Sequence, residues 1–366
     1  MKAIALLPGT KDLSIVDVPE PMIQKPDELK VKILKVGICG TDREEASGGR
    51  ADAPPGEKKL IIGHEMFGKV VEIGAQVKNF KVDDFVIITV RRGCDQCPAC
   101  LSFRSDMCTT GNYTERGIKG RHGFQSEFVV DQEMYAIKAS PQIQNIGVLA
   151  EPMSVVQKAI EEACIIQAAR LPYIKDKTKW LNGKKVLVAG LGPIGLLAAI
   201  TLALRGATVL GLDVVDTNSP RVKILQAIGG TYYNDKQVDP IAFQKDHHHI
   251  DLILDGAGIA KLDFDLLEML GINGVFVLTG VPGDQRLINV DGADLMRKLV
   301  LKNQVMVGSV NESIHHFQKG IEDLETASKK WPGVVDKLIT QKYPYQQFAN
   351  ALSHHSADEI KVVIEW

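Results

Sequence analysis

Four of the six cysteines lie within a single short stretch of the chain. Their spacing is Cys94-x2-Cys97-x2-Cys100-x7-Cys108. Thiolates at such intervals let one tight loop close around a tetrahedral metal, so the spacing predicts a structural zinc site with no position open for substrate. An iron–sulfur cluster fits less well, because its bacterial motif has a shorter last gap and a following proline. Two disulfides, or thiols without a metal, remain alternatives.

A second set of metal-binding residue types is scattered along the first half of the chain. Cys39 stands in Gly-Ile-Cys-Gly-Thr-Asp, His64 and Glu65 are adjacent, and Glu151 stands at the start of a predicted helix. One thiolate, one imidazole and one or two carboxylates make a zinc site that keeps a position for substrate. The pair His64-Glu65 is not a metalloprotease motif, because Gly68 replaces the second histidine. Any one of these residues alone is more often structural, so the prediction depends on the set.

A glycine-rich loop stands between a predicted strand and a predicted helix. Its sequence, Gly190-Leu191-Gly192-Pro193-Ile194-Gly195, fits G-x-G-x-x-G. The glycines allow a tight turn, close approach of the backbone to a pyrophosphate, and close packing of helix on strand, while the helix N-terminus attracts the phosphates. The motif alone also occurs in structural loops, but this context favours dinucleotide binding.

Asp213 ends the next predicted strand, 18 residues after Gly195. A carboxylate at this place accepts hydrogen bonds from the adenosine ribose and repels the 2′-phosphate of NADP. Val214 and Val215 supply no cation for that phosphate. The sequence therefore favours NAD, while Arg221 nearby leaves NADP open. A solvated aspartate at a strand end is the alternative interpretation.

The motifs lie in two regions that differ in their pattern of apolar residues. Residues 1 to about 150 contain short β-type runs separated by Gly, Pro and Asp turns, which predicts a mostly antiparallel β domain. From about residue 183, short apolar strands alternate with helical segments, which predicts a doubly wound parallel sheet. The helix predicted around the glycine loop covers residues 194–204. The last segment loses this alternation, ends in a β-type run at 361–366, and is expected to return to the first domain.

Composition excludes several classes of function. The 366 residues are 45% hydrophobic, and 43 basic residues against 45 acidic ones give a formal charge of -2. This balance provides no basic surface for nucleic acid or an anionic membrane. We find no signal peptide and no apolar run near the ~20 residues that span a bilayer, so we expect a cytoplasmic protein. The histidine runs at 247–249 and 315–316 are interpreted as solvated, and Cys164 as an inert thiol.

Taken together, the motifs resemble those of zinc-containing medium-chain dehydrogenases over nearly the whole chain. Further features resemble the glucose 1-dehydrogenase branch: Cys39 to Glu44, Arg91 to Cys94, Glu115 with Gly117-Ile118, His122 to Phe124, Leu149 to Pro152, and Gly308 to Asn311. The resemblance implies an α/β protein with a GroES-like, mostly-β catalytic domain and a Rossmann nucleotide domain. We set the boundaries at 1–183 for the catalytic domain with its linking helix, 184–308 for the NAD-binding domain, and 309–366 for the return. The resemblance also implies a homo-oligomer, either a dimer or a tetramer.

The resemblance also implies roles for individual residues. Cys39, His64, Glu65 and Glu151 would surround the catalytic zinc, and Cys94, Cys97, Cys100 and Cys108 the structural one, giving two zinc ions per chain. Sugar hydroxyls would contact Thr41, Glu115, Glu151 and Asn311, and Thr41 would also accept the first proton. The dinucleotide would contact the glycine loop and Asp213, together with Thr279, Gly280, Val281, Ser309, Val310 and Asn311.

The implied reaction is oxidation of the anomeric hydroxyl of an aldose to a lactone, with hydride transfer to the nicotinamide. Two departures bear on the substrate: Val155 and Leu301 stand where some relatives have an aspartate and a histidine that contact sugar. Sugar sites select mainly through such polar partners. The resemblance therefore implies an aldose such as glucose, galactose or xylose, and glucose itself is less firmly indicated. A zinc-dependent polyol or secondary-alcohol dehydrogenase is the first alternative, and a non-catalytic NAD-binding protein is the second.

Overall fold

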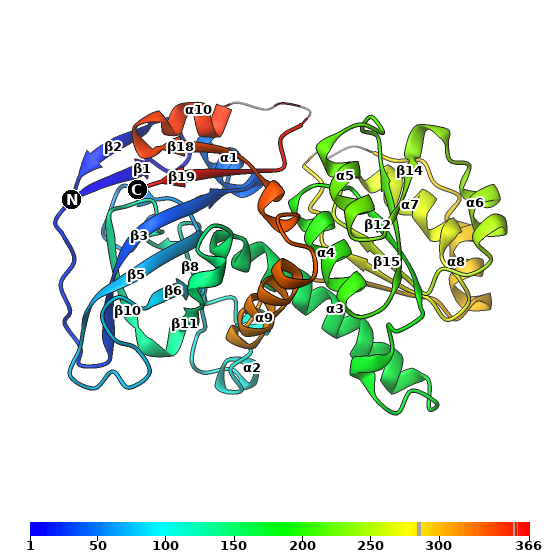
Figure 1. Ribbon diagram of the computed structural model, residues 1–366, viewed down its shortest axis with the longest axis horizontal. Coiled ribbons are helices and arrows are strands. Elements are labelled where there is room, and N and C mark those ends of the chain that lie inside the picture. The colour runs from blue at the N-terminus through cyan, green and yellow to red at the C-terminus, as the bar shows by residue number, and fades with distance from the viewer. Residues whose placement is uncertain (284–286, 354–355, 357) are drawn as a thin grey trace. The chain divides into compact units, whose positions relative to one another are not determined.

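The computed structural model describes residues 1–283, 287–353, 356 and 358–366, which form two compact units (Figure 1). Unit 1 comprises Met1–Ser154, Asn311–Lys329 and Val335–Trp366, and unit 2 comprises Val155–Val310 and Lys330–Val334. The chain therefore leaves unit 1, builds unit 2 and returns to unit 1. The division between units falls inside helix α3 (Ala150–Arg170), whereas the boundaries at 183/184 and 308/309 remain predictions.

Unit 1 is built around one large, mostly antiparallel sheet. Over the described residues this sheet has seven strands in the order β11-β6-β5-β3-β19-β18, with β10 also paired to β3. Strand β3 alternates, with Leu29, Val31 and Ile33 in the core between more exposed neighbours, as expected for a half-buried strand. The strands are β3 (Glu28–Ile38), β5 (Glu65–Ile73), β6 (Phe85–Ile88), β10 (Phe128–Gln132), β11 (Ala136–Ala139), β18 (Ile339–Pro344) and β19 (Lys361–Glu365).

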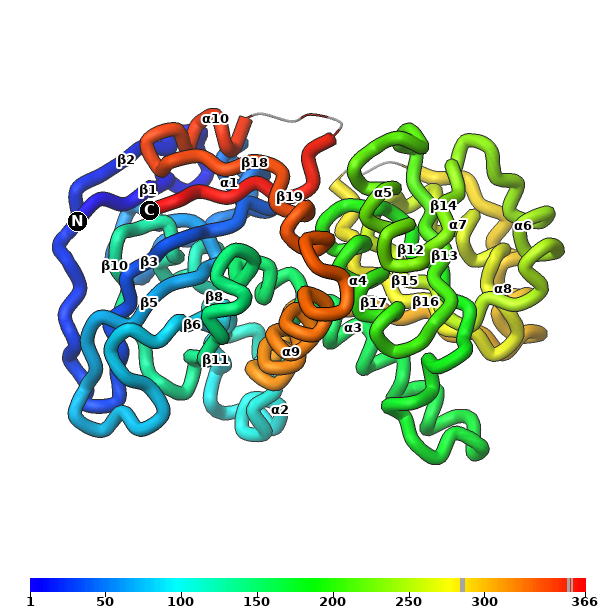
Figure 2. Tube along the Cα trace, in the orientation of Figure 1, coloured from blue at the N-terminus to red at the C-terminus, as the bar shows by residue number. Residues whose placement is uncertain are grey.

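Smaller elements complete unit 1. The chain's last strand, β19, runs beside β3, so the C-terminal segment joins a strand from the start of the chain in one sheet (Figure 2). Two three-stranded sheets contain β1 (Lys2–Leu6), β2 (Leu13–Asp17) and β4 (Leu60–Ile61), and β7 (Arg91–Arg92), β8 (Thr114–Arg116) and β9 (Gly120–Arg121). The helices are α1 (Gly40–Ala46), α2 (Pro98–Leu101), α9 (Ile314–Lys330) and α10 (Phe348–Ser353).

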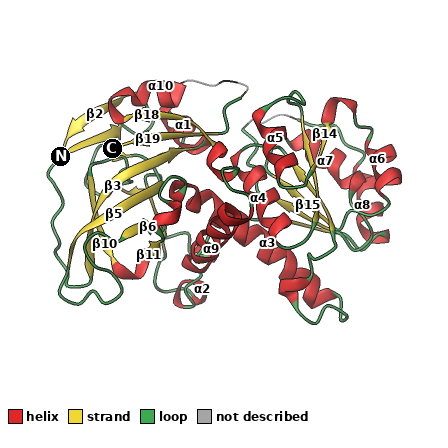
Figure 3. Cartoon of the chain, in the orientation of Figure 1, coloured by secondary structure: helices red, strands yellow, loops and turns green. Residues whose placement is uncertain are grey.

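Unit 2 is a doubly wound parallel sheet with helices packed around it (Figure 3). In the described part of the chain it has six strands, ordered β14-β13-β12-β15-β16-β17, and every pairing is parallel. The strands are β12 (Lys185–Ala189), β13 (Thr208–Asp213), β14 (Thr231–Asn234), β15 (Leu252–Asp255), β16 (Val275–Leu278) and β17 (Val305–Gly308). The helices are α4 (Pro193–Leu204), α5 (Pro220–Ala227), α6 (Pro240–His247), α7 (Ala260–Met269) and α8 (Gly292–Leu301).

Burial explains the sequence patterns of unit 2. Strand β12 is covered on both faces, so Val186–Ala189 is a continuous apolar run. Helix α4 is apolar all round because Gly195–Leu202 is buried. The predicted α/β fold, with a mostly β domain and a Rossmann-type domain, is confirmed. Among the described helices, none is both long and apolar enough to cross a membrane.

Candidate metal and nucleotide sites

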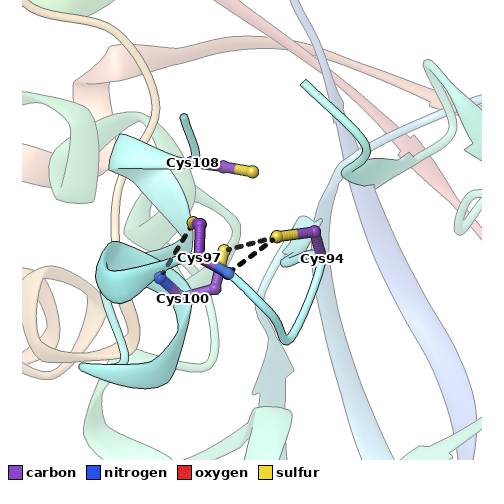
Figure 4. Close-up of side chains that lie close together, drawn as sticks. All are labelled: Cys94, Cys97, Cys100 and Cys108. Carbon is purple, nitrogen blue, oxygen red and sulfur yellow. Dashed lines mark hydrogen bonds between the residues drawn. The ribbon is translucent and has the colours of Figure 1, made fainter. Parts of the chain in front are cut away.

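The four clustered cysteines converge in unit 1. Their sulfur atoms all lie within 4.8 Å of one another, and Cys94 and Cys100 are 3.8 Å apart at Sγ (Figure 4). Four thiolates at the usual Zn–S distance of about 2.3 Å form a tetrahedron with edges of about 3.8 Å. Cys97 begins the short helix α2, whose first turn brings Cys100 back to it. All six cysteines are free thiols, so the disulfide alternative does not hold in this structure.

The second predicted metal set converges on the ends of two neighbouring strands. Cys39 follows β3, while His64 directly precedes β5 and Glu65 begins it, and β3 pairs with β5. The Sγ of Cys39 is 3.1 Å from Nε2 of His64, and one ligand atom each from Cys39, His64 and Glu65 falls within 4.8 Å of the others. Gly37 lies beside Glu65, and a Cβ there would be 2.0 Å from Glu65 Oε2. This mixed set of ligand atoms fits a zinc ion that keeps a position for substrate.

Two charged residues that the sequence analysis did not single out for a role support this set. Asp42 accepts a hydrogen bond from the Cys39 backbone at 2.8 Å, and its other carboxylate oxygen is 3.6 Å from Nδ1 of His64. Lys361, the first residue of β19, donates to both carboxylate oxygens of Glu65 at 2.6 and 2.7 Å, with both side chains buried. A carboxylate behind a metal-binding histidine is a common support. The only feature of the sequence that could have drawn attention to Lys361 is a lysine at the start of an apolar strand.

The electrostatics of the set favour a cation. Burial lowers the pKa of His64, but the charges of Cys39 and Asp42 outweigh it and raise the pKa well above its usual value. The site therefore stabilises positive charge, which a zinc ion would also supply. The residue Glu151, at the start of α3, is partly exposed, although its carboxyl group is buried. This burial and the charge of Glu312 raise the pKa of the Glu151 carboxyl well above the usual range.

The predicted sugar contacts lie in different local settings. Glu115, on β8, is buried and accepts hydrogen bonds from Nε and Nη2 of Arg91 through a single oxygen, Oε1. Asn311 has a left-handed backbone with φ of 59°, which asparagine tolerates better than most residues. Thr41 donates its backbone N–H to Cys39 Sγ at 3.2 Å. Arg91 and Glu312 both line a cavity of about 240 Å³ in unit 1.

The glycine loop in unit 2 has the expected strand–loop–helix context. It connects β12 to α4, Gly190 adopts φ of 79°, and Gly192 caps a helix whose first residue is Pro193. A Cβ on Gly195 would be 1.8 Å from the carbonyl oxygen of Gly190, whereas a Cβ on Gly192 would meet nothing within 4 Å. The third glycine therefore allows helix and strand to pack, and the second leaves open space above the loop.

The other predicted nucleotide contacts of unit 2 follow the carboxyl ends of its strands. Asp213 accepts backbone hydrogen bonds from Leu191 at 2.7 Å and from Val214 at 2.6 Å. Thr279 follows β16 and donates its hydroxyl to the carbonyl of Asp255 at 2.5 Å. Residues 309–310 follow β17, and the buried ammonium of Lys158 donates to the carbonyl of Val310 at 2.8 Å. In parallel sheets this edge is where nucleotides bind.

Family models match most of the chain. The Glucose dehydrogenase C-terminus model covers residues 144–366, and the Alcohol dehydrogenase GroES-like domain model covers residues 25–141. The chain belongs to the glucose dehydrogenase family. Members include the Glucose 1-dehydrogenase of Methanocella arvoryzae, 34% identical, and the Glucose 1-dehydrogenase 2 of Vulcanisaeta moutnovskia, 36% identical, each aligned over 100% of this chain and 99% of the relative. The resemblance inferred from the motifs is confirmed.

Solved structures agree with this family. The glucose dehydrogenase of Haloferax mediterranei, in complex with NADP, Zn and gluconolactone, is 31% identical with a TM-score of 0.87, covering 100% of this chain and 99% of that one. The galactitol-1-phosphate dehydrogenase of Escherichia coli, at 21% identity and a TM-score of 0.81, covers 100% of both chains and shares the fold. Within the glucose dehydrogenase family, this chain combines a zinc-type ligand set with an acidic residue, Asp213, after the second strand of the nucleotide sheet.

Proposed function

We propose that this protein is a zinc- and nicotinamide-dependent aldose 1-dehydrogenase that oxidises the anomeric hydroxyl of a sugar such as glucose, galactose or xylose to the lactone. The observation that carries the proposal is the convergence of Cys39, His64 and Glu65, in a chain that aligns end to end with glucose 1-dehydrogenases. The relative from Haloferax mediterranei was solved with zinc, NADP and gluconolactone, which is the lactone of glucose. A non-catalytic role would not require this ligand set to stay intact.

The chain's own residues have separable tasks in this proposal. When bound, zinc would act as a Lewis acid on the substrate hydroxyl, and the nicotinamide would accept hydride from carbon. Cys39, His64, Glu65 and Glu151 would hold the metal, with Asp42 orienting His64 and Lys361 orienting Glu65. The hydroxyl of Thr41 is our candidate first proton acceptor, because a hydroxyl both accepts and donates hydrogen bonds.

We also propose sugar and metal roles that rest on the family resemblance. Glu115, Glu151 and Asn311 would bind sugar hydroxyls, and a cavity whose lining includes Arg91, the hydrogen-bond partner of Glu115, supports the first of these roles. Four thiolates would hold a second, structural zinc. We propose that the protein prefers NAD to NADP, because Asp213 ends the second strand of the nucleotide sheet. A cytoplasmic location is part of the same proposal, since metal-binding free thiols suit a reducing compartment.

A substrate panel tests the proposal directly. Initial rates would be measured with glucose, galactose, xylose, sorbitol, threonine and a simple secondary alcohol, each with NAD and with NADP. An aldose dehydrogenase is expected to give the highest kcat/KM with one of the three aldoses and to release a lactone. Highest activity with sorbitol or the simple alcohol would instead support the polyol or secondary-alcohol dehydrogenase, and inactivity of zinc-loaded protein towards all of them would contradict an enzymatic role.

A further inference from the structure

A pocket at the carboxyl edge of the unit 2 sheet carries an unusual charge balance. Its volume is about 230 Å³, and its lining includes Gly190 of the glycine loop and the end of β13. If the proposed function holds, this is where the adenosine half of the dinucleotide binds, because that half lies between the glycine loop and the acidic residue that ends the second strand. The ionisable residues in the lining are Asp213, Asp235, Lys261 and Asp265.

The three carboxylates come from separate elements of unit 2. Asp213 ends β13, Asp235 follows β14, and Asp265 lies on α7, so their meeting is a product of the fold. Burial raises the pKa of Asp235, and the charges of Asp265 and Asp213 raise it further. Asp235 therefore experiences the field of both other carboxylates.

Two cations nearby offer only partial compensation. Nη1 of Arg221 lies 3.6 Å from Oδ2 of Asp213, so the charge of Arg221 offsets the Asp213 carboxylate and not an added phosphate. Lys261 supplies one ammonium to a lining that contains three carboxylates. A 2′-phosphate would add a charge of about −1.5 to −2 to this pocket, whereas the ribose hydroxyl of NAD adds none.

We propose that Asp235 and Asp265 act together with Asp213 to exclude the 2′-phosphate of NADP, so that three carboxylates of the adenosine pocket determine the preference for NAD. Asp213 acts by contact with the ribose, and the other two act through their field at longer range. Because charges in a partly solvated pocket interact at several ångströms, each of these two should change NADP affinity by about threefold to tenfold. Exchange of Asp213 alone should consequently leave much of the discrimination in place.

Equilibrium binding tests the inference without relying on turnover. The dissociation constants of NADH and NADPH would be measured by fluorescence titration of zinc-loaded wild-type protein and of Asp235→Asn, Asp265→Asn and the double variant. Asp246→Asn is the matched control, because Asp246 is an exposed carboxylate of unit 2 that does not line the pocket. Each pocket variant should tighten NADPH binding about threefold to tenfold and change NADH binding less than about twofold. Thermal unfolding of each variant would identify any loss of fold.

Ionic strength provides an independent readout. Salt screens repulsion, so the ratio of the NADPH to the NADH dissociation constant should fall in wild-type protein as NaCl rises from about 50 to about 500 mM. The ratio should fall less steeply in the double variant, in which Asp213 is the one remaining carboxylate of the three. A ratio that rises with salt, or pocket variants that bind both nucleotides as wild type does, would overturn the inference while leaving the proposed function standing. Failure of wild-type protein to bind either nucleotide would instead overturn the proposed function.

Discussion

One group of buried charges in unit 1 has partners that come from three different strands. Asp131 on β10 accepts from Arg92 and from Nε of Arg116, the latter at 2.7 Å, and lies 3.8 Å from the partly exposed Arg121. Isolated charges would be strongly destabilising here, and removal of one partner leaves the others uncompensated. This group lies outside the proposed metal sites, so it provides a test of stability alone.

Asp131→Asn is expected to lower the free energy of unfolding by about 3 to 5 kcal/mol, because it leaves two buried guanidinium groups without their carboxylate. The exposed pair of Lys69 with Asp83 supplies the control, and Asp83→Asn should cost less than about 1 kcal/mol. Urea unfolding followed by circular dichroism measures both. Equal effects of the two substitutions would contradict the assignment.

The same residue predicts a pH dependence. Burial favours a raised pKa for Asp131, but Arg116, Arg92 and Arg121 lower it from its ordinary value of 3.8 to about 2. A lowered folded-state pKa contributes stability that is fully present above about pH 4 and is lost as the pH falls towards 2. The difference in stability between wild type and Asp131→Asn should therefore shrink over that interval. A constant difference would show that the charge of Asp131 is not responsible.

Glu115 is the sharpest test of the sugar site. Replacement by alanine would also strip buried Arg91 of its partner, so Glu115→Gln, which keeps an acceptor oxygen, is the better variant. A hydrogen bond to a charged group contributes about 1.5 to 3 kcal/mol, so kcat/KM for glucose and xylose should fall tenfold or more. Turnover of a simple secondary alcohol by the folded variant should be preserved, while thermal stability should fall because buried Arg91 loses its charged partner. Equal loss with the alcohol would remove Glu115 from the sugar site.

The two metal sites should differ in lability. Four thiolates enclose one ion, whereas the mixed-ligand set leaves a position open, so metal analysis should find about two zinc ions per chain and about one after brief chelation. Activity should be lost when the ion of the mixed-ligand site is removed, while the fold remains. Cys100→Ser should remove the other ion and lower thermal stability, with Cys164→Ser as the control that keeps both. Active enzyme with one zinc or none would contradict the two-site proposal.

At the scale of elements, the β12–α4 connection separates folding from binding within one motif. Gly195 packs so closely against Gly190 that a side chain cannot fit, while Gly192 faces open space. Gly195→Ala should therefore lower the thermal stability of unit 2. Gly192→Ala should leave stability unchanged and weaken NADH binding, because its methyl group would occupy the approach of the pyrophosphate. Differential scanning fluorimetry and NADH titration distinguish the two, and wild-type NADH affinity in Gly192→Ala would contradict this division of roles.

At the scale of the whole molecule, the free edge of the unit 2 sheet bears on the homo-oligomer that the family resemblance implies. In the described chain β17 is a terminal strand, and residues 292–308 carry exposed apolar side chains, among them Met296 (57% exposed) and Val300 (74%). Such a strand edge beside apolar surface is normally covered. Met296→Asp with Val300→Asp should yield monomers by light scattering after size exclusion, whereas Met22→Asp, an exposed change in unit 1, should not. An unchanged mass would exclude this surface as the interface.

Local sequence was sufficient for the features that lie within one continuous segment. Apolar patterns predicted β12, α4 and β13, because burial leaves a direct pattern in the chain. The spacing of the four cysteines, and the glycines between strand and helix, likewise encode one loop each. Edge elements such as α8 and β17 had weaker patterns and were not predicted, since much of their surface is exposed.

Tertiary structure alone decided the contacts between distant segments. Lys361 reaches Glu65 across 296 positions because β19 pairs with the strand that also pairs with β5. Likewise, Asp235 lies near Asp213 because β13 and β14 are neighbouring parallel strands, and Asp265 reaches the same pocket from helix α7. Sheet order and register depend on the packing of the whole unit, and no local pattern records which buried charge will face which. The physical reason is that periodicity encodes how a segment is buried, whereas the identity of its partners follows from the complete fold.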